Sequence, residues 1–169
     1  AGEWSHFVSL TFPSVEAAVI SGHLPSLRKG ADAWELRVDL LEDQSAYAIH
    51  RQLALLRAAA PLPVVFTVRS EGQIGRHPDS EPERMFALLR EGLRAGVEWL
   101  DVEACWTGPP TCPSDLVQAL CREARRVPGY GSTTRLLGSL HVTTPQTDAQ
   151  VANLFDKCAL GGAAVHLKV

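Results

Sequence analysis

The chain has 169 residues and a net charge of −3, with 46% hydrophobic and 21% charged residues. This length predicts one domain, residues 1–169, with a sizeable hydrophobic core. The charge argues against direct binding of nucleic acid, and no apolar run is long enough to cross a membrane.

The four cysteines are Cys105, Cys112, Cys121 and Cys158. They form no CxxC pair, and no histidine lies at a spacing typical of a zinc site. We therefore expect reduced thiols in an intracellular protein, nuclear or cytoplasmic, without a metal site. A bridge between Cys105 and Cys112 across a loop is the alternative.

The first half of the chain alternates between strand and helix signals. Residues 7–11 form a short apolar run that predicts a strand, and Ser14 is a good N-cap for the helix that follows. Residues 34–40 alternate strictly between apolar and charged side chains, which predicts a second strand. Residues 46–59 have apolar positions at helical spacing.

The second half continues this alternation. Residues 64–69 predict a third strand ending in Arg69, and a loop over 70–80 leads to a helix that begins at Pro82 and ends at Gly96. Further strands are expected at 97–103, 135–141 and 163–169. Helices are expected from 113–115 onward and from 144–145 to Leu160.

Six strands alternating with helices indicate a parallel sheet covered by helices, hence the α/β class. A doubly wound open sheet and a (β/α) barrel both fit this pattern. The barrel is favoured because polar residues collect late in the strands or at their ends, where barrel active sites lie. These residues are Glu35, Arg37, Asp39, Arg69, Asp101, Glu103, His141 and Lys168. Residues 11–14 lack the glycine fingerprint of a dinucleotide-binding open sheet.

Taken singly, each of these residues could belong to a structural ion-pair cluster. Together they would be a costly cluster, because each buried charge needs its own partner. A pocket for a small, anionic, hydroxyl-rich ligand is the better explanation, since arginines bind carboxylates and carboxylates accept hydroxyl protons. A histidine at the rim can move a proton near neutral pH.

Four segments carry a resemblance to a known family: residues 35–41 (ELRVDLL), 66–70 (FTVRS), 96–103 (GVEWLDVE) and 137–141 (LGSLH). They resemble the type I 3-dehydroquinate dehydratases, above all the fungal version within the pentafunctional shikimate-pathway polypeptide. The resemblance runs from Phe7 to Val169. It implies a (β/α)8 barrel, usually dimeric, that works without metal or cofactor. Because the family has two more β/α units, it also implies a barrel truncated after strand six, with open edges at strands one and six.

The resemblance implies roles for individual residues. In the family, a strand-six lysine forms a Schiff base with the substrate ketone, and a strand-five histidine removes the adjacent proton and helps hydroxide to leave. His141 matches that histidine, and Gln73 matches a glutamate or glutamine beside it. The expected ligand-binding set is Glu35, Arg37, Arg69, Gln73, Glu103 and His141.

The sixth strand departs from the family. An alignment without gaps over residues 159–165 puts His166 at the lysine position, and imidazole cannot form a Schiff base. Lys168 lies two residues further along the same face, about 6.6 Å away, and a two-residue slip would restore the lysine. Elsewhere, apolar Leu140 and Val142 flank His141, and Ile74 occupies the first position of a double glycine.

The first expectation is therefore a non-catalytic dehydroquinase-like domain, similar to that of the fungal quinate repressor. It would bind quinate, 3-dehydroquinate or dehydroshikimate, or contact an activator protein, with a homodimer as a further expectation. The alternative is an active dehydratase fragment with Lys168 as the Schiff-base residue and His141 as the base. A Schiff-base barrel of the class I aldolase type is the third hypothesis.

Overall fold

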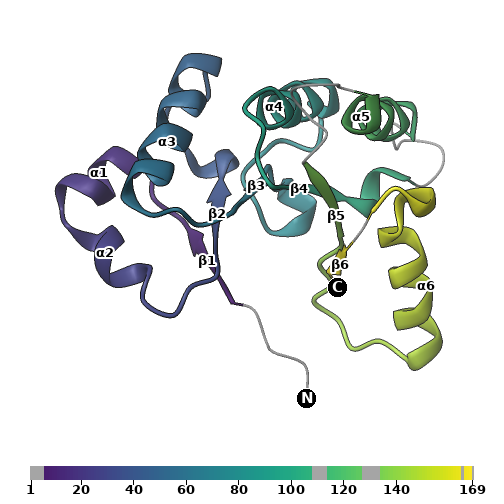
Figure 1. Ribbon diagram of the computed structural model, residues 1–169. Coiled ribbons are helices and arrows are strands. Elements are labelled where there is room, and N and C mark those ends of the chain that lie inside the picture. Colours follow the sequence, from purple (N-terminus) through teal and green to yellow (C-terminus); the bar gives the residue numbers. More distant parts are fainter. Residues whose placement is uncertain (1–5, 108–113, 127–133, 165, 169) are drawn as a thin grey trace.

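The computed structural model describes residues 6–107, 114–126, 134–164 and 166–168. Within these ranges, six parallel strands form one sheet in the order β1-β2-β3-β4-β5-β6 (Figure 1). The strands are β1 (Phe7–Leu10), β2 (Ala33–Arg37), β3 (Val64–Thr67), β4 (Trp99–Glu103), β5 (Arg135–Ser139) and β6 (His166–Lys168). Each strand pairs with its neighbour in sequence, as parallel strands do when helical crossovers connect them.

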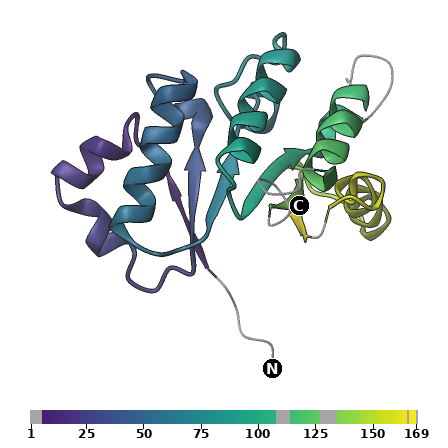
Figure 2. The same cartoon turned by 45° about the horizontal axis from the view of Figure 1, so that its top comes forward.

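The helices lie around the outer side of this sheet (Figures 1 and 2). They are α1 (Val15–Ile20), α2 (His23–Leu27), α3 (Ala46–Ala59), α4 (Pro82–Arg94), α5 (Ser114–Arg126) and α6 (Asp148–Cys158). Short 3-10 turns follow several strands or helices: η1 (Val38–Leu40), η2 (Glu71–Gln73), η3 (Ala104–Thr107) and η4 (Leu160–Gly162). The expected α/β architecture is confirmed, and the order of strands is that of a barrel wall.

The hydrophobic core lies between the sheet and these helices. Trp34, Leu36, Phe66 and Leu100 of the strands are buried, with α3 and α4 covering them. Because side chains alternate along a strand, the residues between these positions face the opposite, inner side of the sheet. That inner side carries the polar residues considered below.

Some element boundaries differ from those expected. β2 ends at Arg37 instead of continuing to residue 40, because Val38–Leu40 form a turn closed by the Leu41 N–H donating to the Val38 carbonyl at 3.1 Å. β5 ends at Ser139, so His141 lies just beyond its strand.

One helix start also differs from expectation. α6 begins at Asp148 because Thr147 and Gln150 form a capping box, which fixes the helix start later than residues 144–145. Ser14 is the N-cap of α1, as expected, although its side chain makes no capping hydrogen bond.

Among the described residues, no helix is long and apolar enough to span a bilayer. Cys112 lies outside the described ranges, and so does the bridge considered between it and Cys105.

Candidate functional site at the carboxyl ends of the strands

The strand register aligns the inner-face polar positions. Arg37 is level with Thr67, Thr67 with Asp101, and Glu103 with Ser139. All of these lie at or near the carboxyl ends of parallel strands. The sheet therefore brings together at one end groups that are far apart in sequence.

Arg69 is the centre of a buried polar network there. Its Nη2 donates to Asp101 Oδ2 at 2.7 Å, and its Nη1 donates to Glu103 Oε1 at 3.1 Å and to Ser139 Oγ at 2.9 Å. The Ser139 hydroxyl in turn donates to Asp101 Oδ1. The Arg69 side chain is only 3% exposed. These contacts satisfy the buried charges from within the fold.

Glu103 accepts further hydrogen bonds in this network. Its Oε1 accepts the Ser70 N–H at 3.0 Å, and its Oε2 accepts the indole N–H of Trp106 at 3.0 Å. The Cys105 thiol lies 3.6 Å from the same Oε2. Glu103 is thus buried between β4, η3 and the loop after β3.

Arg37 stands at the edge of this network and is more open. Its Nε and Nη2 donate to the two carboxylate oxygens of Asp39 at 2.9 and 2.7 Å, and its side chain is 16% exposed. The hydrogen bonds with Asp39 raise the pKa of the Arg37 guanidinium, and burial opposes them. The group stays charged at any physiological pH.

Glu35 is buried and lies two residues before Arg37, on the same inner face of β2. Its Oε1 accepts the Thr67 hydroxyl proton at 3.0 Å. A carboxylate has about four acceptor sites, so Glu35 can bind more than one donor.

His141 lies close to Gln73. The Gln73 side-chain Oε1 accepts the His141 backbone N–H at 2.6 Å. Gln73 is buried and His141 is half-buried. The loop after β3 therefore fixes the backbone that carries the histidine.

The loop of residues 70–80 folds back tightly on β3. His77 N–H donates to the Arg69 carbonyl at 3.0 Å, and Gly75 lies so close to that carbonyl that an added Cβ would be 2.1 Å from its oxygen. Only glycine fits at position 75. Ile74 beside it has φ +66° and an exposed side chain.

β6 adds two positions to the inner face. Its register pairs His166 with Leu137 and Lys168 with Ser139. Ser139 belongs to the Arg69 network, whereas Leu137 lines an apolar cavity nearer the amino ends of the strands. Because Leu137 also pairs with Asp101, backbone positions 166 and 168 are both level with members of the polar network.

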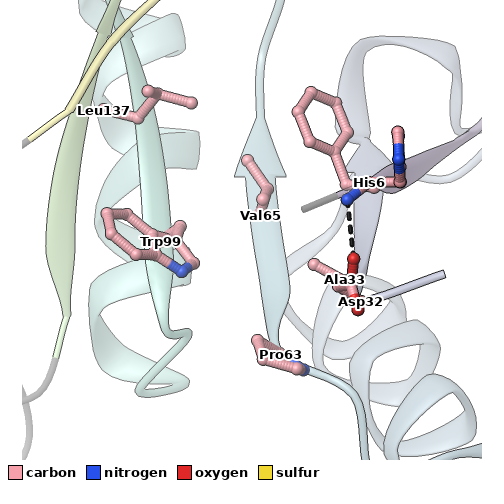
Figure 3. Close-up of a pocket in the computed structure, with 8 residues that line it drawn as sticks. His6, Asp32, Ala33, Pro63, Val65, Trp99 and Leu137 are labelled. Carbon is pink, nitrogen blue, oxygen red and sulfur yellow. Dashed lines mark hydrogen bonds between the residues drawn. The ribbon is translucent and has the colours of Figure 1, made fainter. Parts of the chain in front are cut away.

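That cavity has a volume of about 310 Å³ and lies at the opposite end from the polar network. Figure 3 shows Val65 between Trp99 and Leu137 on one side and His6, Ala33 and Asp32 on the other. Among the residues that line it, the His6 N–H donates to Asp32 Oδ2 at 2.7 Å. The inner face is therefore apolar at its amino end and polar at its carboxyl end.

The structure brings together the residues that sequence reasoning proposed as a site: Glu35, Arg37, Arg69, Gln73, Glu103 and His141. It adds Thr67 and Ser139, which the sequence reasoning passed over. Thr67 lies two residues before Arg69, and Ser139 lies two residues before His141. Because side chains alternate along a strand, this spacing was the signal that could have identified them. In the described parts of the chain, no three His, Cys, Asp or Glu side chains are arranged to hold a metal.

Chemically, this site offers carboxylate acceptors, a guanidinium at its edge and an imidazole at its rim. Arg69 is held by three internal partners. Arg37 keeps Nη1 unused among the residues described. These groups suit a small ligand with several hydroxyls and one anionic group.

Comparison with known protein families gives a match over almost the whole chain. The model of the type I 3-dehydroquinase family matches residues 6–166. The pentafunctional AROM polypeptide of Yarrowia lipolytica is 42% identical over 144 residues, which are 82% of this chain and 8% of that polypeptide. The one from Malassezia globosa is 41% identical over 142 residues, again 82% of this chain and 8% of the polypeptide.

Solved structures give the same fold. The dehydroquinate dehydratase and shikimate dehydrogenase from S. pombe AroM has a TM-score of 0.68 and 28% identity, covering 90% of this chain and 28% of that one. The 3-dehydroquinate dehydratase from Enterococcus faecalis has a TM-score of 0.77 and 18% identity, covering 97% of this chain and 64% of that one. The present chain thus spans less than two thirds of each of these relatives. Its six strands correspond to part of a barrel, as expected from the sequence.

Proposed function

Since this chain belongs to the type I 3-dehydroquinase family, we propose that it binds 3-dehydroquinate and dehydrates it through a Schiff base on Lys168. The register of β6 carries this proposal. It pairs Lys168 with Ser139, which is level with Glu103, so an amine-bearing residue of β6 lies in a row of the Arg69 network; His166, level with Asp101 through Leu137, has an imidazole that cannot form a Schiff base. An amine has to reach the polar end of the strands to meet a hydroxyl-rich ketone.

The residues of the site divide the work in this proposal. The Lys168 amine adds to the substrate ketone and expels water, which leaves an iminium that can accept electrons from the neighbouring carbon. His141 takes the proton from that carbon and returns it to the departing hydroxide. Hydrolysis of the imine then frees the lysine and the product.

The remaining polar groups would hold the substrate. Glu35 accepts hydroxyl protons, and Arg37 presents Nη1, which is unused among the described residues, to the ligand's carboxylate or hydroxyl oxygens. Arg69 and Glu103 act mainly by keeping the pocket in shape, because each is already held by several internal partners. Gln73 fixes the backbone of His141.

The second candidate is a non-catalytic domain of a transcriptional repressor of quinate utilisation. It is favoured by the apolar residues on both sides of His141, which are the buried Leu140 and the 42% exposed Val142. Such neighbours offer no hydrogen bonds that would orient and tune a catalytic base. In this case the same pocket would sense quinate or a related acid, and the domain would contact an activator protein in the nucleus or cytoplasm.

Trapping with borohydride separates these functions. The chain is incubated with 3-dehydroquinate and sodium borohydride, and the adduct is located by peptide mass spectrometry. We expect a reduced adduct on Lys168 that is lost in Lys168→Arg and retained in His166→Gln. His166→Lys serves as the register control, since a slipped strand would move the adduct to residue 166.

An unmodified wild-type protein that still binds quinate by calorimetry would overturn the enzymatic proposal and support the sensor. An adduct on a lysine other than Lys168 would also overturn it. Absence of both adduct and binding would reject both candidates.

A further inference from the structure

We propose that Asp39 is a positioning residue, which holds the Arg37 guanidinium in place and fastens the loop of residues 70–80 to the same point. Asp39 follows β2 by two residues and lies in the turn η1. The proposal rests on the proposed function only in taking Arg37 as a ligand-binding group.

Each carboxylate oxygen of Asp39 accepts two hydrogen bonds. Its Oδ1 accepts from Arg37 Nε at 2.9 Å and from the Arg69 N–H at 3.2 Å. Its Oδ2 accepts from Arg37 Nη2 at 2.7 Å and from the Arg76 N–H at 3.1 Å. The side chain is 0% exposed. One buried carboxylate thus joins the end of β2, the end of β3 and the following loop.

The orientation of Arg37 follows from this bidentate contact. Both bonds lie along the Nε–Nη2 edge of the guanidinium, which fixes the plane of the group and leaves Nη1 for a ligand. A freely rotating arginine would have to be ordered when the ligand binds, and this ordering would weaken binding. Asp39 therefore prepares Arg37 before the ligand arrives.

An amide cannot replace the carboxylate in this position. Asparagine has one acceptor oxygen, and its NH2 group would face two of the four donors that Asp39 accepts. Asp39→Asn is therefore an isosteric test of the inference. Asp43→Asn is the matched control, because Asp43 lies four residues on and its carboxylate accepts the Ser45 N–H at 2.8 Å at an exposed site.

The first measurement is quinate binding by calorimetry, with a double-mutant cycle of Asp39→Asn and Arg37→Gln. We expect Asp39→Asn to lose affinity by about tenfold, as for other residues that orient a binding group, Arg37→Gln to lose at least as much, and Asp43→Asn to bind like the wild type. Because Asp39 acts through Arg37, the double variant should lose no more than Arg37→Gln alone. A folded Asp39→Asn protein with wild-type affinity, or losses that multiply in the double variant, would overturn the inference.

The second measurement needs neither ligand nor activity. Hydrogen exchange at Arg37 Nε–H, followed by NMR, should be slow in the wild type and at least about tenfold faster in Asp39→Asn. If Asp39→Asn does not fold, wild-type Arg37 is compared with Arg94, whose side chain is 63% exposed. Exchange of Arg37 as fast as that of Arg94 would overturn the inference. A wild type that binds neither 3-dehydroquinate nor quinate but protects Arg37 would instead count against the proposed function alone.

Discussion

The side-chain oxygen of Gln73 accepts the backbone N–H of His141 at 2.6 Å, across 68 residues of sequence. This bond joins the loop after β3 to the end of β5. The same loop donates the Arg76 N–H to Asp39 and the Ser70 N–H to Glu103. The loop of residues 70–80 is therefore the part of the chain that couples the expected ligand-binding residues to one another.

The Arg69 network gives the first prediction. Arg69→Met should lower the free energy of unfolding by about 3–5 kcal/mol, because it leaves two buried carboxylates, Asp101 and Glu103, without their cation. Chemical denaturation of the wild type and the variant measures the difference.

The control for this prediction is Arg94→Met. Arg94 pairs with Glu91 on the surface of α4, where its side chain is 63% exposed. Its loss should change the free energy of unfolding by less than about 1 kcal/mol. Equal effects at the two positions would contradict a structural role for the Arg69 network.

Sequence periodicity was sufficient to predict the order of the six strands and of the helices other than α2. The alternation in residues 34–37 and the helical spacing in α3 both come from one buried face, which is visible in the sequence. The turn at Val38–Leu40 could not be predicted, because Asp39 is held there by donors from residues 69 and 76. Local pattern contains no information about partners 30 residues or more away.

The site shows the same division. Arginines and carboxylates late in the strands are visible in the sequence, and the structure brings them together. Their hydrogen bonds are not visible in the sequence. Arg69 donates to internal partners, whereas the Arg37 side chain remains 16% exposed. The pairing of Lys168 with Ser139 depends on the strand register, which the short sequence of residues 163–169 does not determine.

Backbone strain at Ile74 gives the second prediction. Ile74 has φ +66°, a left-handed conformation that costs a non-glycine residue about 1–2 kcal/mol. Its side chain is 67% exposed, so its removal loses few contacts. Ile74→Gly should raise the free energy of unfolding by about 0.5–1 kcal/mol, after the entropy of the more flexible unfolded chain is subtracted.

Ile20→Gly is the matched control for this change. Ile20 is 80% exposed but is the last residue of helix α1, where glycine costs about 0.5–1 kcal/mol. The two substitutions should therefore shift the thermal midpoint in opposite directions. A fall at both positions would show that Ile74 is not strained.

Close packing at Gly138 gives the third prediction. A Cβ at this position would lie 1.7 Å from the carbonyl oxygen of Cys158, at the end of α6. Gly138→Ala must therefore push α6 away from β5, at a cost of about 3 kcal/mol. Gly22→Ala is the control: Gly22 has φ +72°, so alanine there carries backbone strain, but no atom lies within 4 Å of the added Cβ. Its cost should be about 1 kcal/mol, and denaturation curves with equal midpoints would contradict the packing argument.

The fourth prediction concerns the Cys121 thiol on α5. Burial raises the pKa of this thiol, and the nearby Arg125 partly opposes the shift. Because the folded pKa lies above the unfolded value of about 8.5, the unfolded state releases its proton first as the pH rises. The stability that Cys121 contributes is therefore complete below that unfolded value and is lost as the pH rises through the folded pKa.

Two measurements check this. Iodoacetamide at pH 8 should modify half-buried Cys105 before buried Cys121, as mapped by mass spectrometry. Denaturation between pH 8 and pH 10 should show a smaller loss of stability in Cys121→Ala than in the wild type. Equal slopes with pH in the two proteins, or modification of Cys121 as fast as Cys105, would mean that the thiol ionises in the folded state as readily as in the unfolded chain.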